Sequence, residues 1–272
     1  MQLILAAARV TVTLVFLLYS SWSDYKTREV SNKVWALYAP MALTLSLVEF
    51  TLYDQTVFPT FTLSVILTIV SALLLFYTGA FGGADSKAFI CIALALPVFP
   101  KILLKPLLPN GLSPISQTMF PLTVLSSSVL IAATSGLYLL LSNIAHRFTT
   151  GKPLFQGTLA SESLSKKLLV LITGKKFSLK TLKEKWHIYP LEDINETADQ
   201  QPQLQRKLTL VPHDEGRDNV LERLSTAVAA GQIDDDIWAT PGLPMLIFVT
   251  VGLIMALTLG DVIWFLVSLL LT

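Results

Sequence analysis

Long apolar stretches recur along the chain and are separated by short polar ones. Six of them are about 20 residues long and almost uncharged, which is what an α-helix needs to cross about 30 Å of hydrocarbon. They cover residues 3–22, 34–53, 61–80, 88–108, 119–141 and 243–271. Pro97, Pro100, Lys101 and Lys105 interrupt the fourth stretch, so we expect that helix to be short or kinked. The pattern predicts six transmembrane helices.

A polar segment separates the fifth apolar stretch from the sixth. Residues 143–241 hold 13 of the 20 Lys and Arg residues and 13 of the 19 Asp and Glu residues. Short β-type runs are predicted at 168–172, 186–189 and 207–211, a mobile polar loop at 192–205, and an amphipathic helix from Asp218 to about Gly231. We therefore expect a membrane all-α protein with a small soluble α+β domain at 143–241. Residues 1–142 would carry helices one to five, and 242–272 the sixth.

Composition and charge fit a chain embedded in a lipid bilayer. The sequence is 53% hydrophobic with a mean hydropathy of +0.61, and its net charge of +1 gives no reason to expect nucleic-acid binding. Lys26, Arg28 and Lys33 lie in the loop 23–33, Lys87 lies in the loop 81–87, and 143–241 is rich in basic residues. Positively charged loops stay in the cytoplasm, which predicts that these three segments are cytoplasmic and both termini extracellular.

Two aspartates stand where apolar stretches meet the predicted cytoplasmic loops. Asp24 follows the first stretch and Asp85 precedes the fourth. A carboxylate at the edge of the hydrocarbon is costly to keep charged, so such residues usually serve a purpose, although either one alone could be a helix-end carboxylate without a role. Two neighbouring carboxylates do not both ionise easily. One keeps a proton while the other acts as a base, the arrangement with which aspartic proteases activate water.

The residues around both aspartates fit this interpretation. Gly82 and Gly83 lack side chains, which lets the backbone turn tightly beside Asp85 and approach a substrate closely. Arg28 and Asn32 would share a helical face with Asp24 if the first helix continued beyond it. Arg28 would then either favour the charged form of Asp24 or anchor the helix to lipid phosphate.

Two short motifs contain these residues. The stretch from Asp24 to Asn32 reads D-x3-R-x3-N, and the stretch from Gly82 to Lys87 reads G-G-A-D-S-K. The pair resembles the motifs of the type IV prepilin peptidase superfamily. The sequence I-W-A-T-P-G-L-P at 237–244 and the dipeptide G-D at 260–261 are similar to the archaeal preflagellin peptidase branch of that superfamily.

The resemblance implies a membrane aspartic endopeptidase in which Asp24 and Asp85 are catalytic. Gly82, Gly83, Arg28, Asn32 and Lys87 would support them. Such an enzyme removes the short basic signal peptide from preflagellins and type IV prepilins at the cytoplasmic face of the membrane. Neither a metal nor another cofactor is expected, and the expected partners are these substrates and the lipid bilayer.

The sequence limits this interpretation in two ways. Bacterial bifunctional relatives carry a cysteine-rich zinc segment and an N-methyltransferase activity, and Cys91, the only cysteine, cannot supply that segment. We therefore expect no methylation. The preference for archaellins or pilins, the oligomeric state and the role of 143–241 are left open.

A small transporter or channel is the alternative interpretation, with Asp24 and Asp85 binding a proton or cation. That interpretation predicts polar groups at mid-membrane and repeated broken helices, whereas both acids lie at one interface and the chain shows no repeat. A membrane scaffold would leave the G-G-A-D motif without a purpose. Asp261 and Glu49 are predicted to serve helix packing or the outer interface rather than catalysis.

Overall fold

The computed structural model describes residues 1–151, 153–196, 204–209, 216–242 and 244–271. The chain forms two compact units, which we call the helical unit (1–132 and 244–272) and the α/β unit (133–243). Helix α6 (Phe120–Thr150) begins in the first unit and ends in the second. Each unit is described by itself.

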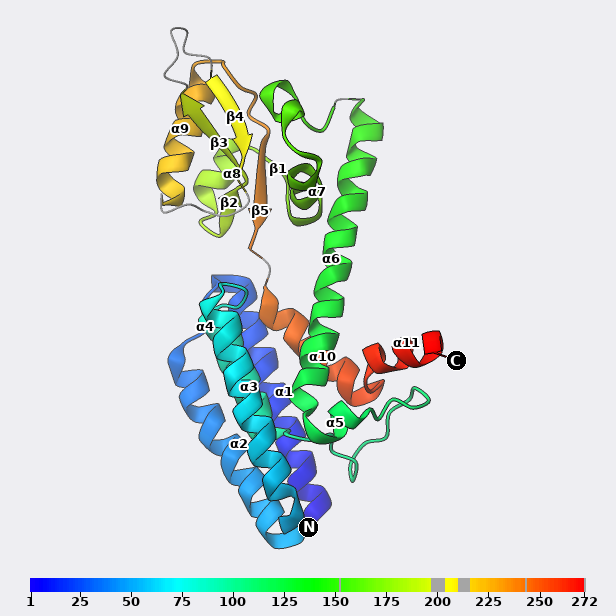
Figure 1. The fold of residues 1–272 in the computed structure, drawn as a ribbon. Helices are drawn as coiled ribbons and strands as arrows, with labels where there is room; N and C mark the ends of the chain where they lie inside the picture. The colour runs from blue at the N-terminus through cyan, green and yellow to red at the C-terminus, as the bar shows by residue number, and fades with distance from the viewer. Residues whose placement is uncertain (152, 197–203, 210–215, 243, 272) are drawn as a thin grey trace. The chain divides into compact units, whose positions relative to one another are not determined.

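The helical unit holds the long apolar helices (Figure 1). Its elements are α1 (Gln2–Thr27), α2 (Asn32–Tyr53), η1 (Gln55–Val57), α3 (Phe58–Tyr77), α4 (Gly83–Ala95), α5 (Pro114–Thr118), the start of α6, α10 (Met245–Thr258) and α11 (Val262–Leu271). In the described part of the chain, α1, α2, α3 with η1, and α6 are long and apolar enough to cross a membrane. Helices α10 and α11 meet at a bend of 58° and make a fifth candidate if they form one span. The protein is thus a mostly helical membrane protein, and a count of six spans stays a prediction.

The fourth apolar stretch forms a short helix, as its prolines and lysines predicted. Helix α4 ends at Ala95 instead of continuing towards residue 108, because Pro97 cannot donate to the helix and disfavours a helical residue before it. The carbonyl groups released at this break find donors on neighbouring helices. Arg9 Nη1 donates to Ala95 O at 2.9 Å, Ser46 Oγ to Leu94 O at 2.6 Å, and Ser64 Oγ to Pro97 O at 2.9 Å. Such partners are what make a broken helix tolerable at membrane depth.

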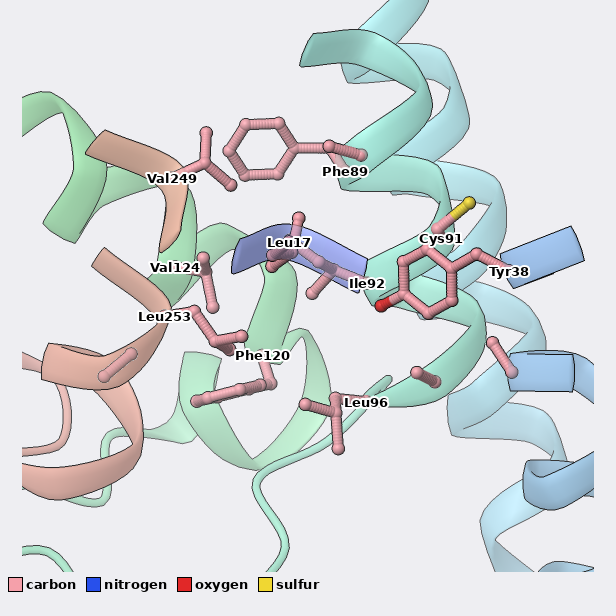
Figure 2. Close-up of a cluster of buried hydrophobic side chains, with 14 of the residues drawn as sticks. Leu17, Tyr38, Phe89, Cys91, Ile92, Leu96, Phe120, Val124, Val249 and Leu253 are labelled. Carbon is pink, nitrogen blue, oxygen red and sulfur yellow. The ribbon is translucent and has the colours of Figure 1, made fainter. Parts of the chain in front are cut away.

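A continuous apolar core joins the helices around α4 (Figure 2). Phe89, Ile92 and Leu96 extend from α4 and its end, and all three are almost fully buried. Leu17 of α1 and Val249 of α10 lie against this cluster. Helices α1, α4 and α10 therefore pack against one another, which brings together segments from opposite ends of the chain.

Helix α10 also approaches α6 closely, at Gly252. A Cβ atom at this position would stand 2.7 Å from the backbone nitrogen of Ser128 and 2.9 Å from its Cα. Small residues allow such close approach between membrane helices, where packing rather than the hydrophobic effect drives association. Gly252 thereby fixes α10 against the rest of the unit.

The α/β unit combines short helices with two small sheets. Its elements after α6 are η2 (Gly157–Ser161), α7 (Leu164–Thr173), β1 (Lys175–Phe177), α8 (Leu179–Glu184), β2 (Ile188–Pro190), β3 (Glu192–Glu196), β4 (Leu204–Leu208), α9 (Arg217–Ala229) and β5 (Ile237–Pro241). Strand β5 pairs antiparallel with β1 on one side and β2 on the other, and β3 pairs antiparallel with β4. Trp238 in the central strand is almost fully buried and anchors this unit.

Some predictions for the α/β unit are confirmed and others are wrong. The amphipathic helix is confirmed as α9, although Gly216 rather than Asp218 precedes it. Strands β2 and β4 overlap two of the predicted runs, but 168–172 lies inside α7, because a short apolar run does not by itself distinguish a strand from a helix.

The prediction of a mobile loop at 192–205 is wrong for the described residues, which form β3 and the start of β4. Residues 197–203 lie outside the described part of the chain. The polar Glu192 is buried there because Arg206 Nε donates to its Oε2 at 2.9 Å and the Trp238 amide donates to its Oε1.

Candidate active site

Asp24 lies in the last turn of α1, where the helix leaves its apolar stretch. Its side chain is half-buried. Helix α1 ends at Thr27, and Arg28 caps it in the left-handed conformation (φ 58°), with its N–H donating to Asp24 O at 3.0 Å. The chain reverses direction within a few residues, and Ser31 then caps α2 through the backbone N–H of Lys33.

Asp85 lies in the first turn of α4 and is also half-buried. Its Oδ2 accepts the backbone N–H of Gly82 at 2.9 Å, which fixes the carboxylate at the start of the helix. The next residue, Ser86, donates from Oγ to Ala72 O at 3.1 Å and so ties this turn to α3. Asp85 is therefore held by its own helix start and by a neighbouring helix.

The two carboxylates are electrostatically coupled. Asp85 lies outside the candidate membrane spans, and burial raises its pKa to about 6, while the Gly82 N–H lowers that pKa and the negative charge of Asp24 raises it further. Because the charge of Asp24 acts on Asp85, the fold brings together two aspartates that are 61 positions apart in the sequence, counted from 24 to 85. A proton is then easiest to keep on Asp85 at a pH where a free aspartate is ionised.

The supporting residues from the two motifs do not lie on one helical face. The expectation that Arg28 and Asn32 share a face with Asp24 is wrong, because α1 ends before Arg28 and Asn32 opens α2. Arg28 still acts on Asp24 through its charge. Lys87 Nζ donates to Asn32 Oδ1 at 2.7 Å, so this exposed bond links the second motif to the first.

The two glycines have different environments. A Cβ on Gly82 would stand 3.2 Å from Asp85 Oδ2, whereas a Cβ on Gly83 would stand an ordinary 3.7 Å from Phe76 Cε2. The predicted tight turn falls at Gly79 instead, which has a φ of +75°, while Gly82 has a φ of −75° that other residues adopt. Gly82 is needed for space next to Asp85 rather than for an unusual backbone conformation.

The first turn of α10 completes the surroundings of Asp24, and no sequence pattern indicated this. The backbone N–H of Leu246 acts on the Asp24 carboxylate. Ser21 Oγ, one turn earlier on α1, donates to Leu246 O at 2.8 Å and lies 2.7 Å from Thr250 Oγ1. Ordinary serine and threonine residues in apolar helices carry no local signal for such a contact, because most of them bond within their own helix.

Asp261 and Glu49, the two deeper acids, are engaged elsewhere. Asp261 Oδ2 accepts from Ser113 Oγ at 2.6 Å, and its Oδ1 accepts the Trp264 N–H at 3.0 Å at the start of α11. Glu49 Oε2 accepts from Arg9 Nε at 2.8 Å, and both side chains are buried. A sequence signal for this pair did exist, since Arg9 and Glu49 lie at similar distances before and after the loop that joins α1 to α2.

The acid–base groups of the site are its two carboxylates. Among the described residues, no three His, Cys, Asp or Glu side chains group as metal ligands. A coupled pair of carboxyl groups can hold one proton between them, and it can move that proton during a reaction.

Two models of known protein families match segments of this chain. A family model described as the type IV leader peptidase family matches residues 11–141, which include Asp24 and Asp85. A second model, described as archaeal Peptidase A24 C-terminus type II, matches residues 166–262, which cover most of the α/β unit together with α10. This chain belongs to the type IV leader peptidase family. No curated protein matches the chain. This leader peptidase is thus of the archaeal prepilin and preflagellin type, as the two sequence motifs predicted.

Proposed function

We propose that this leader peptidase is an aspartic endopeptidase that removes the short basic signal peptide from preflagellins and prepilin-like proteins at the cytoplasmic face of the membrane. Asp24 and Asp85 carry out the chemistry. The observation that supports this most directly is their electrostatic coupling between helices α1 and α4, inside the segment matched by the family model.

The mechanism follows from the unequal surroundings of the two acids. Asp24, with the Leu246 N–H and the charge of Arg28 beside it, serves as the base that takes a proton from water. Asp85 holds the other proton and gives it to the carbonyl oxygen as water adds. Asp24 then passes the proton from water to the leaving amine, and Asp85 recovers a proton from the diol as the peptide bond breaks. The bond that breaks is the peptide bond after the signal peptide. Peptide groups within a helix are shielded by their own hydrogen bonds, so this stretch of the substrate must be extended.

The proposal also states on which side of the membrane cleavage takes place. The loop 28–31, the start of α4 and the basic segment 143–241 face the cytoplasm, where the basic end of a leader peptide also remains. Neither a metal nor another cofactor takes part.

The test is cleavage of a co-expressed preflagellin in membranes that contain the wild type, Asp24→Asn or Asp85→Asn at equal levels. Both substitutions should abolish processing, because neither amide can exchange a proton as a carboxyl group does. Glu29→Gln is the matched control, since Glu29 is an exposed carboxylate in the loop after Asp24 and should be dispensable. Normal cleavage by either aspartate variant would refute the paired mechanism and favour a proton or cation transporter instead.

A further inference from the structure

Helices α1 and α10 are joined by a compact set of buried hydroxyl contacts. Ser21 Oγ lies 2.7 Å from Thr250 Oγ1, and Thr250 Oγ1 lies 2.9 Å from Leu246 O and 3.3 Å from Leu17 O. Ser21 is 8% exposed and Thr250 is 3% exposed. Hydroxyl groups buried at a contact between membrane helices stabilise one relative position of the two helices.

This contact lies one helical turn from the candidate catalytic base. Ser21 and Asp24 are three positions apart in α1 and share a face of it. On the other helix, Leu246 is the second residue of α10, so its N–H has no partner within the helix. In the described part of the chain, Pro244 gives α10 no side-chain cap. The Leu246 N–H acts on the Asp24 carboxylate.

We propose that Ser21 and Thr250 are positioning residues, which hold the first turn of α10 against the turn of α1 that carries Asp24, so that the Leu246 amide faces this carboxylate. The inference rests on the proposed function and assigns roles within it. Asp24 is the base and Asp85 carries the proton. The positive end of a helix, together with a free N–H, favours an anion at this position.

The other charges that act near Asp24 come from identified elements. Arg28 at the end of α1 attracts it, and Asp85 on α4 repels it. Helix α10 has no charged residue, so its influence comes from backbone and hydroxyl groups. From α2, Lys33 is exposed in the first turn, and Glu49 lies near the opposite end of that helix, paired with Arg9.

The experiment measures kcat/KM against pH for the full-length enzyme in liposomes, with purified preflagellin as substrate. Ser21→Ala and Thr250→Val should move the acidic limb of the profile upwards by about half a pH unit, because the Leu246 amide and the positive end of α10 are then held less firmly against Asp24. Thr250→Ser keeps the hydroxyl group and should restore the limb. The position of the limb does not depend on how much of each variant folds.

The control is Thr68→Val, which removes a buried threonine hydroxyl whose hydrogen bond among the described residues stays within α3, to Ser64 O at 2.7 Å. It should leave the profile in place. An unmoved acidic limb in both Ser21→Ala and Thr250→Val overturns the positioning role, even if Asp24→Asn is inactive. If Asp24→Asn cleaves normally, the proposed function is wrong and this inference with it.

Discussion

Gly82→Ala perturbs the contact that orients Asp85 while leaving the backbone free of strain. Gly82 precedes α4 with φ −75° and ψ 164°, which alanine adopts readily. The added methyl group would stand 3.2 Å from Asp85 Oδ2, the same oxygen that accepts the Gly82 N–H at 2.9 Å. The carboxylate must therefore move away by a few tenths of an ångström, and the hydrogen bond lengthens.

The size of the effect follows from that bond. Asp85 is protonated in the proposed mechanism, and a hydrogen bond to a neutral group contributes about 0.5–1.5 kcal/mol, so a partial loss costs about 0.5–1 kcal/mol of transition-state stabilisation. Since each 1.36 kcal/mol is tenfold in rate, we expect kcat/KM for preflagellin cleavage to fall roughly 2- to 5-fold. Displacement of a catalytic group acts in the same direction.

Gly83→Ala is the matched control. Its methyl group would meet Phe76 Cε2 at an ordinary 3.7 Å, and alanine favours the helix over glycine by about 0.5–1 kcal/mol. We expect its cleavage rate to stay within about twofold of the wild type, with an equal or higher thermal stability. The assay is the initial rate of cleavage by purified variants in liposomes. Wild-type rates for Gly82→Ala, or an equal loss in both variants, would refute the reasoning.

Two further predictions concern the buried ion pair and the pH dependence. Glu49→Gln leaves Arg9 buried without a counter-ion and should lower the free energy of unfolding by about 3–5 kcal/mol, measured by thermal unfolding in detergent. The double variant Arg9→Met, Glu49→Leu should lose less, and an equal loss would contradict the assignment. Because the raised pKa of Asp85 keeps its proton up to about pH 6, kcat/KM should fall as the pH rises through that region. A flat profile between about pH 5 and pH 8 would show that this proton is not needed.

Part of the active site could be predicted because its signals are local. Asp24 and Asp85 interrupt the pattern at the ends of apolar stretches, and each is embedded in a short motif that resembles those of one family. Lys87 Nζ donates to Asn32 Oδ1 at 2.7 Å and so links the two motifs, while the supporting roles of both residues stay a prediction. The prediction that Arg28 and Asn32 share a helical face with Asp24 is wrong. Arg28 takes a left-handed conformation at the end of α1, where the chain reverses into α2.

Hydrophobic pattern and motifs were enough to establish that the chain enters a membrane, where its long helices lie and which carboxylates belong to the family motifs. These features follow from hydrophobicity and spacing over about twenty neighbouring residues, and a local pattern is enough to encode them. Packing in three dimensions was needed to show that α4 stops at Ala95 with Arg9 as a partner, and that Ser21 meets Thr250 across 229 positions. Such contacts depend on which helix faces are adjacent after packing, and a buried polar group has only to find some partner, so the spacing along the chain does not specify which one.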